Sequence, residues 1–147
     1  MATIRSFEEL EVWKKARMVS REIFKVTMSE SFSKDFALKD QINRASGSIM
    51  DNIAEGFERG GRKEFIQFLS YAKGSAGEVK SQLYRAMDHG HINEETFQKF
   101  QSDISEIGKM IAGLITYLNR TTLEGTKHLK EPDSDYQALH FGFEAQL

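Results

Sequence analysis

The chain has no cysteine, a single proline and four histidines among its 147 residues. Without cysteine it can form no disulfide and no thiolate metal site, so it carries no signature of an oxidising compartment. No apolar run approaches the roughly 20 residues that span a bilayer, and the opening MATIRSFEEL lacks the apolar stretch of a signal peptide. We therefore expect a cytoplasmic protein without a membrane partner.

Charge of one sign is also scarce. Residues 1–120 hold 18 Lys and Arg against 17 Asp and Glu, whereas residues 121–147 hold 2 against 5, so the formal net charge of −2 comes from the C-terminal end. A near-neutral body lacks the strongly basic surface typical of nucleic-acid-binding domains and leaves only local patches. The polar and acidic stretch after residue 120 contains the only proline, Pro132, and predicts an acidic, partly flexible tail over residues 121–147.

Hydrophobic periodicity predicts an all-α fold. Apolar residues recur at spacings of three and four in segments that cover about residues 6–28, 38–56, 62–87 and 93–118. Ser6 and Glu9 have the spacing of a capping box, which predicts that the first helix begins there. Short connections between four amphipathic helices favour an antiparallel up-down-up-down four-helix bundle over residues 1–120, followed by a C-terminal extension.

Two patches of small residues, Ala45–Ser48 and Gly74–Gly77, interrupt the second and third predicted helices. Each glycine costs about 1 kcal/mol of helix propensity relative to alanine. The patches therefore predict either that these helices approach each other closely or that a neighbouring subunit packs into the recess. Glycine tolerated at a solvent-exposed surface is the remaining interpretation.

Beside their main apolar stripes, the helices carry more large hydrophobic side chains than one bundle interior needs. Contiguous exposed apolar surface of this kind usually marks an interface between subunits. The candidate interface residues are Trp13, Phe24, Ile66, Tyr71, Tyr84, Met110 and Ile115.

The sequence offers no catalytic or metal-binding constellation on this helical plan. No histidine follows a glutamate by three positions, the spacing with which bundles build a carboxylate-bridged metal centre. His89 and His91 are expected to be turn residues and not ligands. The segment GFERGGRK resembles a P-loop, but it follows a predicted helix and has Lys63 where Ser or Thr should hold magnesium. We therefore expect neither an enzyme nor a bound cofactor or metal.

Two groups of basic residues could bind an anion. Arg59, Arg62 and Lys63 cluster at the start of the third predicted helix, where free amides and the helix dipole favour a phosphate. Solvated loop charge is the alternative for this group. A second set shares one face of the first helix and could follow a phosphate backbone, or could be the ordinary polar side of an amphipathic helix. That set consists of Lys14, Arg17, Arg21 and Lys25.

One combination of residues is specific to a known family. The motif is Asn52–Gly56, followed by Arg59, Phe65, Phe68, Leu69 and Gly74–Ala76. Together with the opening FEELEVWKKA, it resembles the bacterial four-helix bundle family named for the protein encoded in 23S ribosomal RNA intervening sequences. The resemblance covers about residues 6–120.

The resemblance implies a bundle that assembles as a homo-oligomer, in the form of a pentamer, and it supplies no catalytic residues. Residues of the matching region with an expected structural role are Arg44, Asn52, Glu55, Gly56 and Gly74. A related family, the accessory variability protein of diversity-generating retroelements, binds nucleic acid through a markedly basic surface that this sequence lacks. We therefore expect a noncatalytic scaffold or adaptor associated with rRNA intervening sequences. The alternative is a nucleic-acid-binding accessory factor that contacts structured RNA or DNA through its basic patches.

Overall fold

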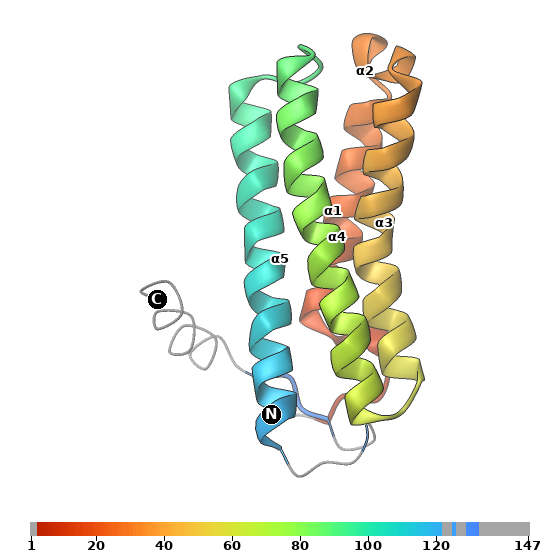
Figure 1. The fold of residues 1–147 in the computed structure, drawn as a ribbon, viewed down its shortest axis with the longest axis vertical. Coiled ribbons are helices and arrows are strands. Elements are labelled where there is room, and N and C mark those ends of the chain that lie inside the picture. The colour runs from red at the N-terminus through yellow and green to blue at the C-terminus, as the bar shows by residue number, and fades with distance from the viewer. Residues whose placement is uncertain (1–2, 122–124, 126–128, 133–147) are drawn as a thin grey trace.

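Four long helices and one short helix account for most of the structure, a computed structural model that describes residues 3–121, 125 and 129–132 (Figure 1). The helices are α1 (Glu11–Thr27), α2 (Glu30–Lys34), α3 (Phe36–Glu58), α4 (Arg62–Asp88) and α5 (Glu94–Arg120), preceded by a 3-10 turn, η1 (Phe7–Glu9). None of the described helices has the length and apolarity needed to cross a membrane. The short helix α2 lies within a segment that the sequence analysis assigned to a connection.

The four long helices form an antiparallel up-down-up-down bundle (Figure 1). Helix α3 packs against α4, α4 packs against α5, and α1 packs against both α3 and α5, so that the four rods close around one core. The predicted fold class is therefore confirmed. Helix α2 and the turn between α4 and α5 lie at the same end of the bundle, opposite the end where α1 begins.

The core is built from the apolar stripes that the periodicity predicted. Along α5, every residue of the predicted seam is buried: Phe97, Phe100, Ile104, Ile107, Ile111, Leu114 and Leu118. The facing helices contribute side chains such as Ile23, Leu38, Ile49, Ile53, Phe65 and Leu69. Burying a side chain of this size contributes roughly 1.5–3 kcal/mol, and this is the main source of the bundle's stability.

The N-terminus of α1 differs from the prediction. The helix begins at Glu11, after η1, and the Ser6 side chain makes no capping hydrogen bond. The carboxylate of Glu131 caps the helix instead, because it accepts hydrogen bonds from the backbone N–H groups of Glu11 at 2.8 Å and Val12 at 3.2 Å. The predicted capping box is therefore wrong: an acceptor that is distant in the sequence satisfies the free amides of α1.

Part of the predicted tail packs on the bundle, at the end where α1 begins. Leu129 is fully buried, and its carbonyl accepts a hydrogen bond of 2.8 Å from the backbone N–H of Ile4. Gly125 forms an antiparallel bridge with Gly61. Burial raises the pKa of Glu131 above its usual value. The folded unit therefore extends past the predicted boundary at residue 120, whereas residues 133–147 of the predicted tail lie outside the described part of the chain.

Helices α3 and α4 approach each other closely at the two patches of small residues. Ala45 and Ala76 are buried between the helices. The Ser75 hydroxyl donates a hydrogen bond of 3.0 Å to Ser48 Oγ across the same contact. The close approach that the small residues predicted is therefore present, although it uses alanine and serine and not the glycines of the patches.

Candidate functional site

The predicted basic face of α1 is exposed to solvent. Its four members are Lys14, Arg17, Arg21 and Lys25. Lys14 forms an ion pair of 3.1 Å with Glu11, and the Arg17 guanidinium lies 5.8 Å from the ring centre of Trp13. Neither Arg21 nor Lys25 forms an ion pair with a described residue. This face therefore has cations that can meet an external phosphate.

The predicted anion site at the start of α4 does not form as one cluster. Arg59 pairs with Glu55 at 2.9 Å, and this hydrogen bond raises the pKa of Arg59. Arg62 Nη1 points elsewhere and donates hydrogen bonds to the carbonyls of Leu118 at 3.0 Å and Thr121 at 3.5 Å. Only Lys63 is exposed without an ion pair to a described residue.

Local geometry explains why these three cations separate. Glu55 precedes Arg59 by one helical turn, where opposite charges pair readily. The last carbonyls of α5 have no partner within their own helix, and Arg62 satisfies them. Arg59, Arg62 and Lys63 are thus not brought together as one cluster, because two of the three cations have partners inside the chain, and anion binding by this group stays a prediction.

The seven candidate interface residues fall into two groups. Trp13, Ile66, Met110 and Ile115 are partly buried against the core. Phe24, Tyr71 and Tyr84 are 54%, 50% and 54% exposed. The structure adds three exposed apolar side chains that the sequence analysis did not select, namely Met18, Met28 and Phe36.

One face of α4 combines exposed aromatic residues with glycine. Helical spacing places Gly74, Gly77 and Ser81 at the centre of this face and Tyr71 and Tyr84 at its two edges, about 140° apart around the helix axis, and all five are exposed. No atom lies within 4 Å of the position that a Cβ would occupy at Gly74 or Gly77. The face is therefore a shallow strip of helix backbone, bounded by two tyrosines that lie about 20 Å apart along the helix. We call these five residues the α4 face.

The residues of the family motif have different roles. Asn52 Nδ2 donates to the carbonyl and the hydroxyl of Ser48, both at 2.8 Å, within α3. A Cβ at Gly56 would lie 2.6 Å from Phe68 Cβ, so glycine is needed there for the contact between α3 and α4. Arg44 pairs with Asp40 at the surface. The expected structural role is thus evident for Asn52 and Gly56, whereas nothing within the described chain requires glycine at position 74.

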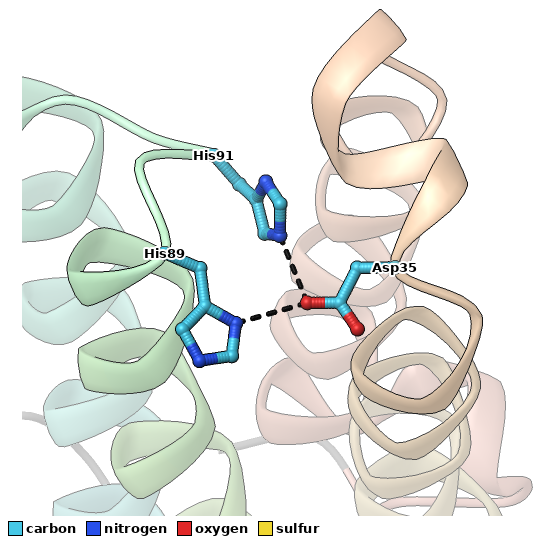
Figure 2. A group of neighbouring side chains, drawn as sticks. All are labelled: Asp35, His89 and His91. Atoms are coloured by element: carbon cyan, nitrogen blue, oxygen red, sulfur yellow. Dashed lines mark hydrogen bonds and ion pairs between the residues drawn. The ribbon is translucent and has the colours of Figure 1, made fainter.

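Three side chains that the sequence analysis did not connect meet at the end of the bundle where α2 and the turn between α4 and α5 lie (Figure 2). Asp35 joins α2 to α3, and His89 and His91 lie in the turn between α4 and α5. Asp35 Oδ2 lies 2.9 Å from His91 Nε2 and 2.9 Å from His89 Nδ1. The hydrogen bonds from His91 and His89 lower the pKa of Asp35 to about 2. The histidines are turn residues, as predicted, but they also bind a carboxylate.

The fold and these surfaces define an all-α protein of the four-helix bundle class. The chain matches the model of the 23S rRNA-intervening sequence protein family over residues 8–113, and it belongs to this family. The family resemblance expected from the Asn52–Gly56 motif is therefore confirmed. No curated protein matches the chain.

The chain is also similar to a solved structure. This is a protein of unknown function from the S23 ribosomal protein family of Bacteroides thetaiotaomicron, with 28% sequence identity and a TM-score of 0.65. The match covers 71% of this chain and 97% of that chain. The helical fold is thus shared with this protein, and the match to the family model ends at residue 113, within α5.

Proposed function

We propose that this protein is a noncatalytic, cytoplasmic scaffold or adaptor that works as a homo-oligomer, a pentamer, and is associated with rRNA intervening sequences. The observation that carries the proposal is the α4 face. Membership of the 23S rRNA-intervening sequence protein family supports the association with the rRNA insertion. The family resemblance carried by the Asn52–Gly56 motif supplies no catalytic residues, and this supports a noncatalytic role.

The α4 face has the properties of a surface against which a second helix packs. Gly74 and Gly77 each cost about 1 kcal/mol of helix propensity relative to alanine. No contact within the described part of the chain offsets this cost, because a Cβ at either position would meet open space. Tyrosines are enriched at protein interfaces, and the half-exposed Tyr71 and Tyr84 flank the glycines. A helix of a second copy that packs between the tyrosines would cover both the exposed rings and the exposed backbone.

The assembly is tested by light scattering of the full chain with matched variants. The wild-type protein is expected to have five times the 16.8 kDa mass of one chain. Gly74→Gln should lower this mass, because the new side chain occupies the strip while its higher helix propensity supports folding of the single chain. Ser102→Gln, which enlarges another exposed small residue on α5, serves as the control and should keep the wild-type mass. A wild-type protein that stays monomeric at high concentration would contradict the proposal.

A second candidate function is supported by the exposed basic face of α1. Arg21 and Lys25 are exposed beside Phe24, which is 54% exposed and could stack on an unpaired base. Under this alternative the protein is an accessory factor that contacts structured RNA. The near-neutral body limits the number of phosphate contacts to those on this face.

The alternative predicts RNA binding that depends steeply on salt. Titrating a fluorescent 23S rRNA stem-loop at two salt concentrations should show weaker binding at the higher one. The double variant Arg21→Gln and Lys25→Gln should reduce the slope of log affinity against log salt by about one per phosphate contact removed. Lys109→Gln, at an exposed position on α5, is the control and should leave the slope unchanged. If no association is detected even at low salt, the nucleic-acid alternative is removed.

A further inference from the structure

We propose that Asp35, His89 and His91 form a binding site for Zn²⁺ that connects the junction of α2 and α3 to the turn between α4 and α5. This inference is independent of the scaffold role and of the pentamer. It also revises the expectation from the sequence that the two histidines are not ligands, since that expectation considered only ligands in the bundle interior.

The three donor atoms lie close enough together to share one zinc ion. One ligand atom from each residue lies within 4.8 Å of the others. Zinc binds imidazole nitrogen and carboxylate oxygen at about 2.0–2.2 Å, so that two donors on a tetrahedral ion lie about 3.3 Å apart. The distances of 2.9 Å from Asp35 Oδ2 to the two ring nitrogens are close to this separation. The ligand atoms of the two histidines lie within 4.8 Å of each other, so an ion that replaces the shared protons must draw the three donors to this common spacing (Figure 2).

The carboxylate is held in place by the backbone of α3. Asp35 is the N-cap of this helix, and its Oδ1 accepts a hydrogen bond of 3.3 Å from the backbone N–H of Leu38. This bond fixes the orientation of the carboxyl group and leaves Oδ2 directed at the histidines. A ligand whose second oxygen is fixed by a neighbouring donor is typical of protein metal sites.

His91 is held more firmly than a surface histidine. Its side chain is only 9% exposed, and its ring stacks on that of Phe32 at 4.8 Å between ring centres. Its Nδ1 forms a hydrogen bond with the hydroxyl of Ser31. Without an ion, Nε2 donates to the Asp35 carboxylate, and the Ser31 hydroxyl can accept from Nδ1 once an ion takes the place of the Nε2 proton. Ser31 can therefore support the tautomer that a metal ion needs.

The turn after α4 places both histidines by a Schellman motif. The backbone N–H of His91 donates to the Ala86 carbonyl at 2.9 Å, and that of Gly90 donates to the Met87 carbonyl at 3.0 Å. Gly90 has a φ of +77°, a conformation that glycine adopts without strain. The two rings thus leave a rigid turn and converge on Asp35 from the same side.

The ligand set favours zinc over the hard cations. Two imidazole nitrogens and one carboxylate suit Zn²⁺, whereas Mg²⁺ and Ca²⁺ prefer oxygen donors alone. The His89 side chain is 46% exposed, so solvent can reach the site and supply a fourth ligand. Asp35 is separated from His89 by 54 residues in the sequence. The ion therefore cross-links the two helical hairpins of the bundle.

The test is a calorimetric titration of the full chain, first freed of metal with a chelator, with Zn²⁺. One ion per chain is expected, and the unfolding temperature should rise with zinc concentration because the unfolded chain has no assembled site. Asp35→Asn retains a capping oxygen but loses the charged ligand, so its affinity should fall by more than the roughly 10–100-fold cost of losing an outer-shell partner. Asp40→Asn removes an exposed carboxylate from the same helix and should bind as the wild type does.

Two further variants keep the proposal falsifiable. His89→Gln changes a half-exposed side chain at the end of α4, so it should fold normally and also lose binding. Replacing His128 and His140 by asparagine removes the other two histidines of the sequence and should leave binding intact. The proposal is overturned if Asp35→Asn and His89→Gln both bind zinc as tightly as Asp40→Asn, or if the double variant loses the ion.

Discussion

Replacing Gly56 by alanine is expected to lower the free energy of unfolding by about 2 kcal/mol, the typical cost of overpacking a core. The added Cβ would lie 2.6 Å from Phe68 Cβ and 3.2 Å from Phe65 Cδ1. Phe68 Cβ is attached directly to the backbone of α4, and Phe65 is fully buried. Neither atom can move away by a simple side-chain rotation, so α3 and α4 must separate to accept the methyl group.

Gly47→Ala is the matched control for this prediction. It makes the same chemical change on the same helix, but no atom lies within 4 Å of the new Cβ. Because alanine has the higher helix propensity, this variant should gain up to about 1 kcal/mol. Urea unfolding followed by circular dichroism measures both variants, at one protein concentration because assembly contributes to the apparent stability. Equal effects of the two substitutions would show that Gly56 does not hold α3 close to α4.

The helices could be predicted because the spacing of apolar residues within each segment is enough to indicate a helix. The buried seam of α5 is a run of apolar residues at spacings of three and four, and nothing outside that helix is needed to recognise it. The two patches of small residues likewise indicated a close contact between these helices, although alanine and serine make that contact and the glycines whose cost suggested it face open space. Local patterns therefore sufficed for the fold class.

The positions of the charged groups could not be predicted in the same way. Asp35 contacts His89 because the junction of α2 and α3 lies at the same end of the bundle as the turn between α4 and α5. The two residues are 54 positions apart in the sequence, so a local pattern cannot indicate this contact. Arg62 was expected to bind an external anion, but it donates a hydrogen bond to the Leu118 carbonyl at the end of α5. In both cases the hydrogen-bond partner of the charged side chain is determined by how the helices pack, and helical periodicity carries no information about that packing.

The start of α1 shows the same limit at a helix end. A hydrogen-bond acceptor three residues from Ser6 was present in the sequence, yet Glu131 caps the helix instead. The segment around Glu131 is polar and contains Pro132, so its composition resembles that of a flexible tail. Leu129 is a single apolar residue in this segment and forms no periodic pattern. The sequence therefore could not indicate that the segment packs on the bundle.

Substitution of that leucine, Leu129→Ala, is expected to destabilise the protein by about 3 kcal/mol, within the range for a large-to-small change at a buried site. Leu129 is fully buried, although it lies nine residues beyond the end of α5. Its loss leaves a cavity at the end of the bundle and loosens the segment that carries Glu131. The N-terminus of α1 then loses part of its cap, which adds to the cost of the cavity.

Lys130→Ala changes the next residue, which is exposed, and should alter the stability by less than about 0.5 kcal/mol. The pair is compared by urea unfolding, and hydrogen exchange of the Glu11 and Val12 amides tests the coupling to α1 directly. Both amides should exchange faster in Leu129→Ala than in Lys130→Ala, because each donates to the Glu131 carboxylate in the folded chain. If Leu129→Ala unfolds at the same urea concentration as its neighbour, residues 129–132 add nothing to the bundle and α1 must be stabilised without them.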